Sequence, residues 1–203
     1  MRPTNDIVIM GGGVIGLAIA IDLKLRGAAV TVLSRDFQQA AVHAAAGMLA
    51  PRAEAIVASP MLDLCLESLA LYPGWISKLE DLSATSTGYW SSGILAPLYA
   101  PLDRQNQECS GSPPDLCPNR VWLDRTAIHQ AQPGLSRDVV GAWWYPEEGQ
   151  VDNRALAQAL RLTAEVLGID IQAGVAVTGI QQHHGRVTGL STTAAIALRS
   201  TIS

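Results

Sequence analysis

Two short apolar runs flank an amphipathic stretch at the start of the chain. Ile7–Ile9 is an uninterrupted β-branched run, and Val30–Leu33 is a second run of similar character. Such runs are typical of strands that are buried on both faces of a parallel sheet. Between them, Leu17 and Ile21 follow the spacing of a helix that ends at Gly27. The pattern therefore predicts a strand, a turn, a helix and a second strand in this order.

Further apolar and amphipathic segments predict both helices and strands over the rest of the chain. The expected helices are Ser59–Leu82, broken or kinked at Pro73–Gly74, then Asp124–Ile128 and Asn153–Leu167. The expected strands are Tyr89–Tyr99, Val139–Tyr145, Ile169–Ile171, Val175–Val177 and Arg186–Leu190. Pro97 and Pro101 are expected to end the first of these strands, and a turn at Gln181–Gly185 is expected to precede the last. A proline-rich surface loop is expected at Leu102–Asn119.

Two pairs of titratable side chains fall in predicted turns. Glu147 and Glu148 lie in the turn Pro146–Gly149, and His183 and His184 lie in the hairpin turn. Turns run over the surface of a protein. We therefore expect all four side chains to be solvated, and we do not interpret the adjacent carboxylates as a catalytic pair.

Gly11, Gly13 and Gly16 follow the first predicted strand and match the pattern G-x-G-x-x-G. In a dinucleotide-binding unit the first glycine permits a tight turn, the second lets a pyrophosphate approach, and the third lets the helix pack against the strand. The phosphates would lie on the free N–H groups at the start of the helix, where Val14 and Ile15 follow. The surrounding strand–helix–strand pattern makes a plain glycine loop the weaker interpretation.

The end of the second predicted strand departs from this pattern. Dinucleotide-binding units usually carry Asp or Glu there to bind ribose hydroxyls, whereas this chain has Ser34, followed by Arg35 and Asp36. Ser34 offers an uncharged hydrogen bond. Arg35 suits the 2′-phosphate of NADP, and its alternative is a solvated loop charge, which we favour.

Composition narrows the class of protein. The 203 residues are 48% hydrophobic and 16% charged, so we expect a globular fold with a sizeable core. A net charge of −4 without a basic cluster argues against binding nucleic acid. No apolar run reaches the length of a membrane span and no signal peptide is evident, which predicts a cytoplasmic protein. Cys65, Cys109 and Cys117 are expected to be free thiols without a metal role.

The segment Phe37–Pro51 has two interpretations. Its alanines are compatible with a helix closed by Pro51. The small side chains of Ala44–Met48 would also let an extended backbone lie flat against a large planar ligand, and Gly47 is a poor choice for a plain helix.

The glycine pattern followed by Ala44-Ala45-Ala46-Gly47-Met48-Leu49 resembles the FAD-dependent D-amino-acid oxidase family, and in particular its cyanobacterial glycine oxidase branch. The resemblance implies FAD as cofactor. It also implies that residues beyond the glycine turn line the cofactor, namely Val42, His43, Ala46, Gly47, Met48 and Val177. Ser34 and Arg35 are further candidates for cofactor binding because they follow the second predicted strand. Met48 would lie nearest the substrate, and Val177 would contact the adenine side. We interpret His43 as a polar residue that positions backbone, because no second ligand supports a metal.

The resemblance implies an α/β fold with a Rossmann-like parallel sheet and part of a mainly antiparallel substrate domain. The expected FAD-binding segments are residues 1–85 and 150–203, and residues 86–149 would form the substrate portion. The implied activity is oxidative deamination of glycine or another small amine with O2, giving peroxide, with a link to thiamine biosynthesis. Whether a full-length form is a homo-oligomer stays open.

The resemblance extends over residues 5–193 and then stops. The family's substrate-binding Arg and neighbouring Tyr have no match here, so no catalytic residue is assigned. We expect a truncated or frameshifted product with an exposed sheet edge. The alternatives are an NAD(P)-dependent dehydrogenase and a non-catalytic nucleotide-binding remnant.

Overall fold

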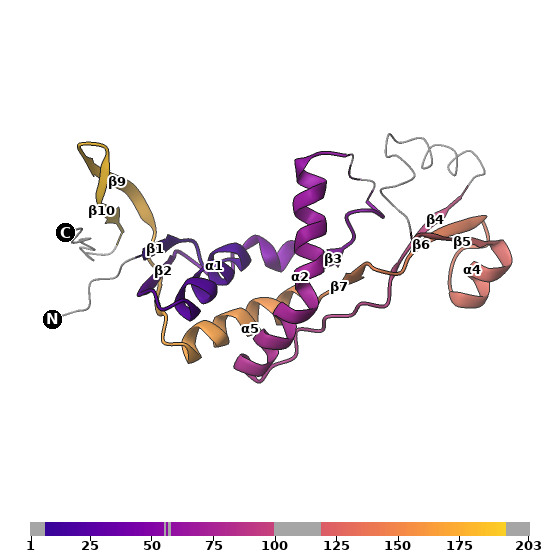
Figure 1. Ribbon diagram of the computed structural model, residues 1–203, viewed down its shortest axis with the longest axis horizontal. Helices are drawn as coiled ribbons and strands as arrows, with labels where there is room; N and C mark the ends of the chain where they lie inside the picture. Colours follow the sequence, from indigo (N-terminus) through magenta and orange to yellow (C-terminus); the bar gives the residue numbers. More distant parts are fainter. Residues whose placement is uncertain (1–6, 55, 57, 100–118, 194–203) are drawn as a thin grey trace. The chain divides into compact units, whose positions relative to one another are not determined.

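The computed structural model describes residues 7–54, 56, 58–99 and 119–193. The chain divides into two compact units, which are treated separately (Figure 1). The first contains Met1–Ala46, Ser77–Thr87 and Asp152–Ser203, and the second contains Gly47–Ile76 and Gly88–Val151. The domain boundaries expected from the sequence stay a prediction.

A parallel sheet with strand order β1-β2-β8 forms the centre of the first unit. Its strands are β1 (Ile7–Met10), β2 (Val30–Ser34) and β8 (Asp170–Ala173). Ile7 is paired with Val30, and Thr31 is paired with Asp170. The central strand β2 is buried along its whole length, which fits its β-branched and apolar run Val30–Leu33.

β1 is less buried than its sequence predicts. Ile7, Val8 and Ile9 are only partly buried, so the expectation of burial on both faces is wrong for this strand. The reason is its position, because β1 pairs with β2 on one side and with no other strand of the described residues.

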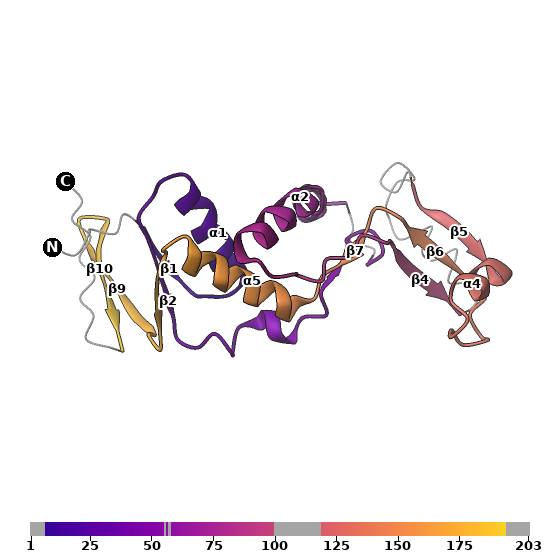
Figure 2. The ribbon, with the colours of Figure 1, turned by 90° about the horizontal axis from the view of Figure 1, so that it is seen from below.

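Two helices pack against each other beside this sheet (Figure 2). α1 (Val14–Leu25) buries Leu17, Ala20 and Ile21, and α5 (Asn153–Val166) buries Leu156 and Leu160 among others. α5 starts as predicted: the Asp152 carboxylate accepts hydrogen bonds from the Arg154 and Ala155 N–H groups at 2.9 and 3.0 Å.

A two-stranded antiparallel ribbon completes the described part of the first unit. β9 (Val177–His183) and β10 (Arg186–Thr192) pair through a turn at His184–Gly185, where both residues have positive φ. The turn is therefore shorter than expected. Val175 and Ala176 do not belong to a strand, because Gly174 turns the chain at φ 76° and the Val175 N–H bonds to the Ser34 carbonyl. His183 and His184 are exposed, as predicted.

The second unit is built on an antiparallel sheet with strand order β4-β6-β5. The strands are β4 (Ile94–Leu98), β6 (Gly141–Tyr145) and β5 (Val121–Asp124), and α4 (Arg125–Ala131) packs on β6. β4 is shorter than the predicted strand, and Pro97 lies inside it. The proline is tolerated because β4 lies at the edge of the sheet.

The remaining elements bear on two expectations. α2 (Pro60–Ser83) continues through Pro73, with Leu62 buried before the proline and Ile76 and Leu79 buried after it, so the expected break does not occur and the expected kink stays a prediction. Phe37–Pro51 is not a helix: it contains the single 3-10 turn η1 (Ala41–Ala44) and the short strand β3 (Met48–Leu49). β3 pairs with β7 (Gly149–Gln150).

The expected loop Leu102–Asn119, with Cys109 and Cys117, lies outside the described residues except for Asn119. Cys65 is a free thiol. Within the described ranges, we find no helix with the length and apolar character needed to span a membrane.

A hydrogen-bonded carboxylate near the end of α2 gives a pH-dependent prediction. The Glu80 carboxylate accepts bonds from the Thr87 N–H (2.6 Å) and hydroxyl (2.8 Å), and these bonds lower the pKa of Glu80. Its stabilising effect should be present above about pH 4.3 and should be lost as the pH falls through the lowered pKa. We expect Glu80→Gln to reduce the free energy of unfolding by about 1 kcal/mol near pH 7. The difference should shrink in acid, as measured by urea unfolding.

The neighbouring carboxylate provides the control. Asp81 is exposed, so Asp81→Asn should change stability by less than about 0.5 kcal/mol. A difference between Glu80→Gln and the native chain that grows in acid would contradict the assignment.

Candidate functional site

The glycine turn brings β1 and α1 into close contact. Gly11 has φ 113°, and its N–H donates to the Leu33 carbonyl of β2 at 2.8 Å. A Cβ placed on Gly16 would lie 2.0 Å from the Gly11 carbonyl oxygen, so only glycine fits this position. The roles predicted for Gly11 in turning and for Gly16 in close packing therefore agree with the geometry.

Gly12, which sequence reasoning did not single out, is constrained by side chains rather than by backbone. A Cβ on Gly12 would lie 2.2 Å from Cε1 of Phe37 and 2.9 Å from Cβ of Ser34. The ring of Phe37 thus packs on the middle glycine of the turn. The run of three consecutive glycines was the available signal, although the contact itself depends on a residue beyond β2.

A cavity of about 600 Å³ opens beside this turn, at the carboxyl ends of β1 and β2. Parallel α/β sheets bind ligands at this end of their strands. The predicted residues among its lining are Gly11, Gly13, Ser34, Arg35 and Val177. The lining also includes residues that were not predicted, namely Met10, Gly12, Leu33, Asp36, Gln39, Ala40, Ala41, Val175, Ala176, Thr178, Gly179 and Ile180.

The other predicted residues do not line this cavity. Val14, Ile15 and Gly16 form the first turn of α1, and Val42, His43 and Ala46 lie in and after η1. Gly47 and Met48 belong to the second unit. Their assignment to the cofactor stays a prediction.

The start of α1 is suited to an anion. Its N-cap is Gly13, which provides no side-chain cap for the N–H groups of the first turn. The nearest atom to a Cβ on Gly13 would be Ala40 Cβ at 4.0 Å, so the space beside this residue is open. Uncapped N–H groups and the positive end of the helix dipole together favour a phosphate. The residues present therefore fit the pyrophosphate of a dinucleotide.

The polar side chains at and after the end of β2 differ in whether they are already hydrogen-bonded within the protein. Ser34 is 4% exposed and lines the cavity. The Arg35 guanidinium donates to Gln39 Oε1 at 3.2 Å, and the Asp36 carboxylate accepts from the Gln38 N–H at 2.8 Å. Asp36 therefore caps its own loop.

Side chains hold the segment around η1 in place. The His43 Nε2–H donates to the Phe37 carbonyl at 3.1 Å, and the Asn153 side-chain amide donates to the Val42 carbonyl. His43 thus positions backbone, as predicted. The described residues contain no group of three or more His, Cys, Asp or Glu side chains arranged for a metal ion.

A buried carboxylate in the second unit contradicts the expectation that Glu148 is solvated. Glu148 is 0% exposed, and its Oε1 and Oε2 accept hydrogen bonds from the N–H groups of Arg52 (2.6 Å) and Ala53 (3.1 Å). Burial raises the pKa of Glu148, and the N–H groups and the Arg52 guanidinium act in the opposite direction. Glu148 is buried because residues 96 and 95 positions earlier supply its partners, which local turn signals cannot reveal.

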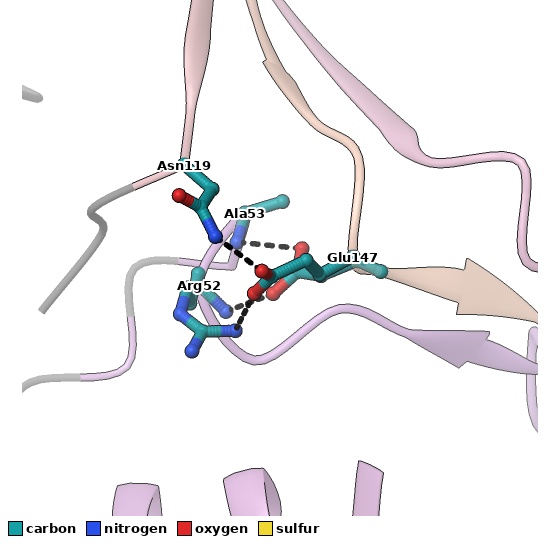
Figure 3. A network of polar contacts seen from close by, with 5 residues as sticks. Arg52, Ala53, Asn119 and Glu147 are labelled. Carbon is teal, nitrogen blue, oxygen red and sulfur yellow. Dashed lines mark hydrogen bonds and ion pairs between the residues drawn. The ribbon is translucent and has the colours of Figure 1, made fainter. Parts of the chain in front are cut away.

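Glu147 is partly exposed, as expected for a turn. Its side chain is 51% exposed, accepts from the Asn119 amide and lies 3.8 Å from the Arg52 guanidinium. Arg52 thus contacts both adjacent carboxylates: its guanidinium lies near Glu147 (Figure 3), and its N–H group donates to Glu148.

Comparison with known proteins identifies a family, related sequences and solved structures that resemble this chain. A family model described as DAO, FAD dependent oxidoreductase, matches residues 6–202. The bifunctional protein ThiO/ThiG of Nostoc sp. is 55% identical over 95% of this chain. The glycine oxidase of Bacillus licheniformis is 28% identical over 96% of it. The crystal structure of glycine oxidase from Geobacillus kaustophilus superimposes with a TM-score of 0.84 at 27% identity, covering 93% of this chain.

These matches cover only part of each relative. The chain spans 29% of the Nostoc protein, 52% of the Bacillus licheniformis enzyme and 51% of the Geobacillus chain. The α/β fold with parallel and antiparallel sheets agrees with that of the solved structure.

The lack of space for a Cβ at Gly12 and Gly16 leads to a prediction about stability. Gly12→Ala and Gly16→Ala should each lower the free energy of unfolding by about 1–3 kcal/mol, because the added methyl has no room. Phe37→Ala should relieve the first substitution in part, because the contact with Ser34 Cβ remains, and should not relieve the second, because the obstacle to Gly16→Ala is backbone. A double-mutant cycle in urea measures this coupling.

Gly74 serves as the control. It lies in α2, and no atom stands within 4 Å of the position that a Cβ on this residue would occupy. Gly74→Ala should leave stability unchanged or raise it by up to about 1 kcal/mol. A Gly16→Ala variant with native stability would contradict the close contact.

Proposed function

The chain belongs to the DAO family of FAD-dependent oxidoreductases, and we propose that its first unit binds the dinucleotide FAD in the cavity beside the glycine turn. The single observation that carries this proposal is the uncapped start of α1 at the rim of that cavity. Phosphate groups require donors, and this helix start offers N–H groups that no side chain of the N-cap satisfies. The family match over residues 6–202 supports the choice of FAD.

Each predicted residue has a proposed role in this complex. The turn Gly11–Gly13 and the first helical residues Val14 and Ile15 bind the pyrophosphate through backbone N–H groups. Ser34 and Arg35 contact the adenosine ribose, and Val177 contacts adenine through its backbone. The segment that carries Val42, His43, Ala46, Gly47 and Met48 lies beside the flavin.

We propose that the reaction is oxidative deamination of glycine or another small amine with O2. Bound FAD would accept a hydride from the carbon that carries the amino group. The reduced flavin would then be reoxidised by O2, which is reduced to peroxide. The residues of this chain bind and orient the cofactor. The names of the Bacillus licheniformis and Geobacillus kaustophilus relatives, both glycine oxidases, support this substrate class. A place for the reaction in thiamine biosynthesis is part of the same proposal and is supported by likeness to ThiO/ThiG.

Arg35 motivates one competing function. An arginine after β2 suits the 2′-phosphate of NADP, and Arg35 lines the cavity. If the chain bound NADPH, Arg35→Ala should weaken that binding by at least about tenfold. For FAD, which has no 2′-phosphate, we expect a change of less than about threefold.

The visible absorbance of the purified chain, before and after adding FAD, tests the proposed cofactor. We expect flavin bands that survive desalting and that excess NADPH does not remove. Peroxide formation with glycine then separates an oxidase from a remnant that only binds nucleotide.

Gly13→Asp provides a sharper test of the same site. Asp is a favourable N-cap and the space around Gly13 is open, so stability should hold or rise by about 1 kcal/mol. The new carboxylate would occupy the helix start and repel phosphate, so FAD affinity should fall at least about tenfold. Gly134→Asp, at a position with no nearby atoms, is the matched control. Equal FAD affinity of Gly13→Asp and the native chain would reject this site.

A further inference from the structure

The strand that carries Met48 is held by a very short ladder. Met48 pairs with Gln150, Leu49 pairs with Gly149, and the Val151 N–H donates to the Gly47 carbonyl at 2.9 Å. A slip of one residue in a strand turns every side chain to the opposite face. Two residue pairs specify register weakly, so the direction of Met48 depends on a further restraint.

The partner strand β7 is itself firmly placed. Gln150 and Trp90 exchange two backbone hydrogen bonds at 2.8 and 2.9 Å, and the Gly93 N–H donates to the Glu148 carbonyl at 3.0 Å. A Cβ on Gly149 would lie 2.5 Å from the Trp90 carbonyl oxygen. β7 therefore cannot shift along its neighbour without a clash, and it forms a fixed frame for β3.

The side chain of Glu148 connects this frame to the turn that follows β3. Its two carboxylate oxygens accept bonds from the successive N–H groups of Arg52 and Ala53 (Figure 3). The carboxylate is fully buried, and a buried acceptor that loses its donors is costly. A slip of β3 by one residue would displace both N–H groups from the two oxygens.

We propose that Glu148 is a positioning residue whose buried carboxylate holds the register of Gly47–Leu49 and thereby the direction of the Met48 side chain. Met48 is 51% exposed, so core packing does not fix it. The importance of this direction for the flavin rests on the proposed function, in which Met48 lies beside the cofactor. Glu147, the adjacent carboxylate, lies 3.8 Å from the Arg52 guanidinium, whereas the two N–H bonds that form the restraint go to Glu148.

Glu148→Gln tests the restraint with little change in volume. The glutamine oxygen can accept one of the two N–H groups, but its NH₂ group faces the other donor. Hydrogen–deuterium exchange at the Arg52 and Ala53 amides should become about tenfold faster. Glu147→Gln, the same substitution on a half-exposed neighbour, should leave exchange at these amides unchanged. Thermal unfolding of both variants confirms that they are folded at the exchange temperature.

A second readout asks whether the restraint acts through Met48. With FAD bound, Glu148→Gln should shift the visible flavin band, whereas Glu147→Gln should not. The double variant Glu148→Gln/Met48→Ala should then give the same band as Met48→Ala alone, because the side chain that transmits the change is gone. A purely structural role for Glu148 would leave the band of the folded, flavin-loaded variant unchanged.

The outcomes separate this inference from the proposed cofactor. Faster exchange with a band shift that disappears in the double variant supports the positioning role. Native exchange in Glu148→Gln, or additive shifts in the double variant, overturns it. If the native chain retains no flavin, the FAD proposal fails, and exchange at Arg52 and Ala53 alone decides whether Glu148 holds the strand.

Discussion

The contact between the Gly11 carbonyl and Gly16 is the constraint on which the first unit depends. Because α1 lies so close to the glycine turn that a methyl group would not fit, the start of the helix is fixed relative to the end of β1. The Gly11 N–H fixes the same turn to β2 through the Leu33 carbonyl. The start of α1 and the end of β1 are therefore held in fixed positions, and both border the cavity.

This arrangement relies on backbone more than on charged side chains. Arg35 and Asp36 are the charged residues that line the cavity, and the Asp36 carboxylate is engaged by its own loop. In the proposed FAD complex, backbone N–H groups of the glycine turn would donate to the phosphates, and glycine exposes these groups best. In the second unit a side chain binds backbone donors instead: the carboxylate of Glu148 accepts hydrogen bonds from two backbone N–H groups in the turn after β3.

Local patterns predicted much of the fold, and long-range contacts account for the failures. The apolar run of β2, the Asp152 cap of α5 and the glycine turn were predictable because each depends on residues within a few positions. Of the break or kink expected at Pro73, the break does not occur, because apolar side chains on both sides of the proline are buried. Five predicted site residues line the cavity, while Gly12 was missed because its constraint comes from Phe37. Glu148 was misjudged because its partners, Arg52 and Ala53, lie far away in the sequence.

The order of the strands in the parallel sheet has a consequence for synthesis on the ribosome. β1, α1 and β2 emerge first, but β8, which pairs with the other edge of β2, is made only after the whole second unit. During that interval the nascent chain presents the open edge of β2, the strand that is buried along its whole length in the native fold. Translation speed through residues 47–151 and the supply of chaperones would then affect the yield of native protein.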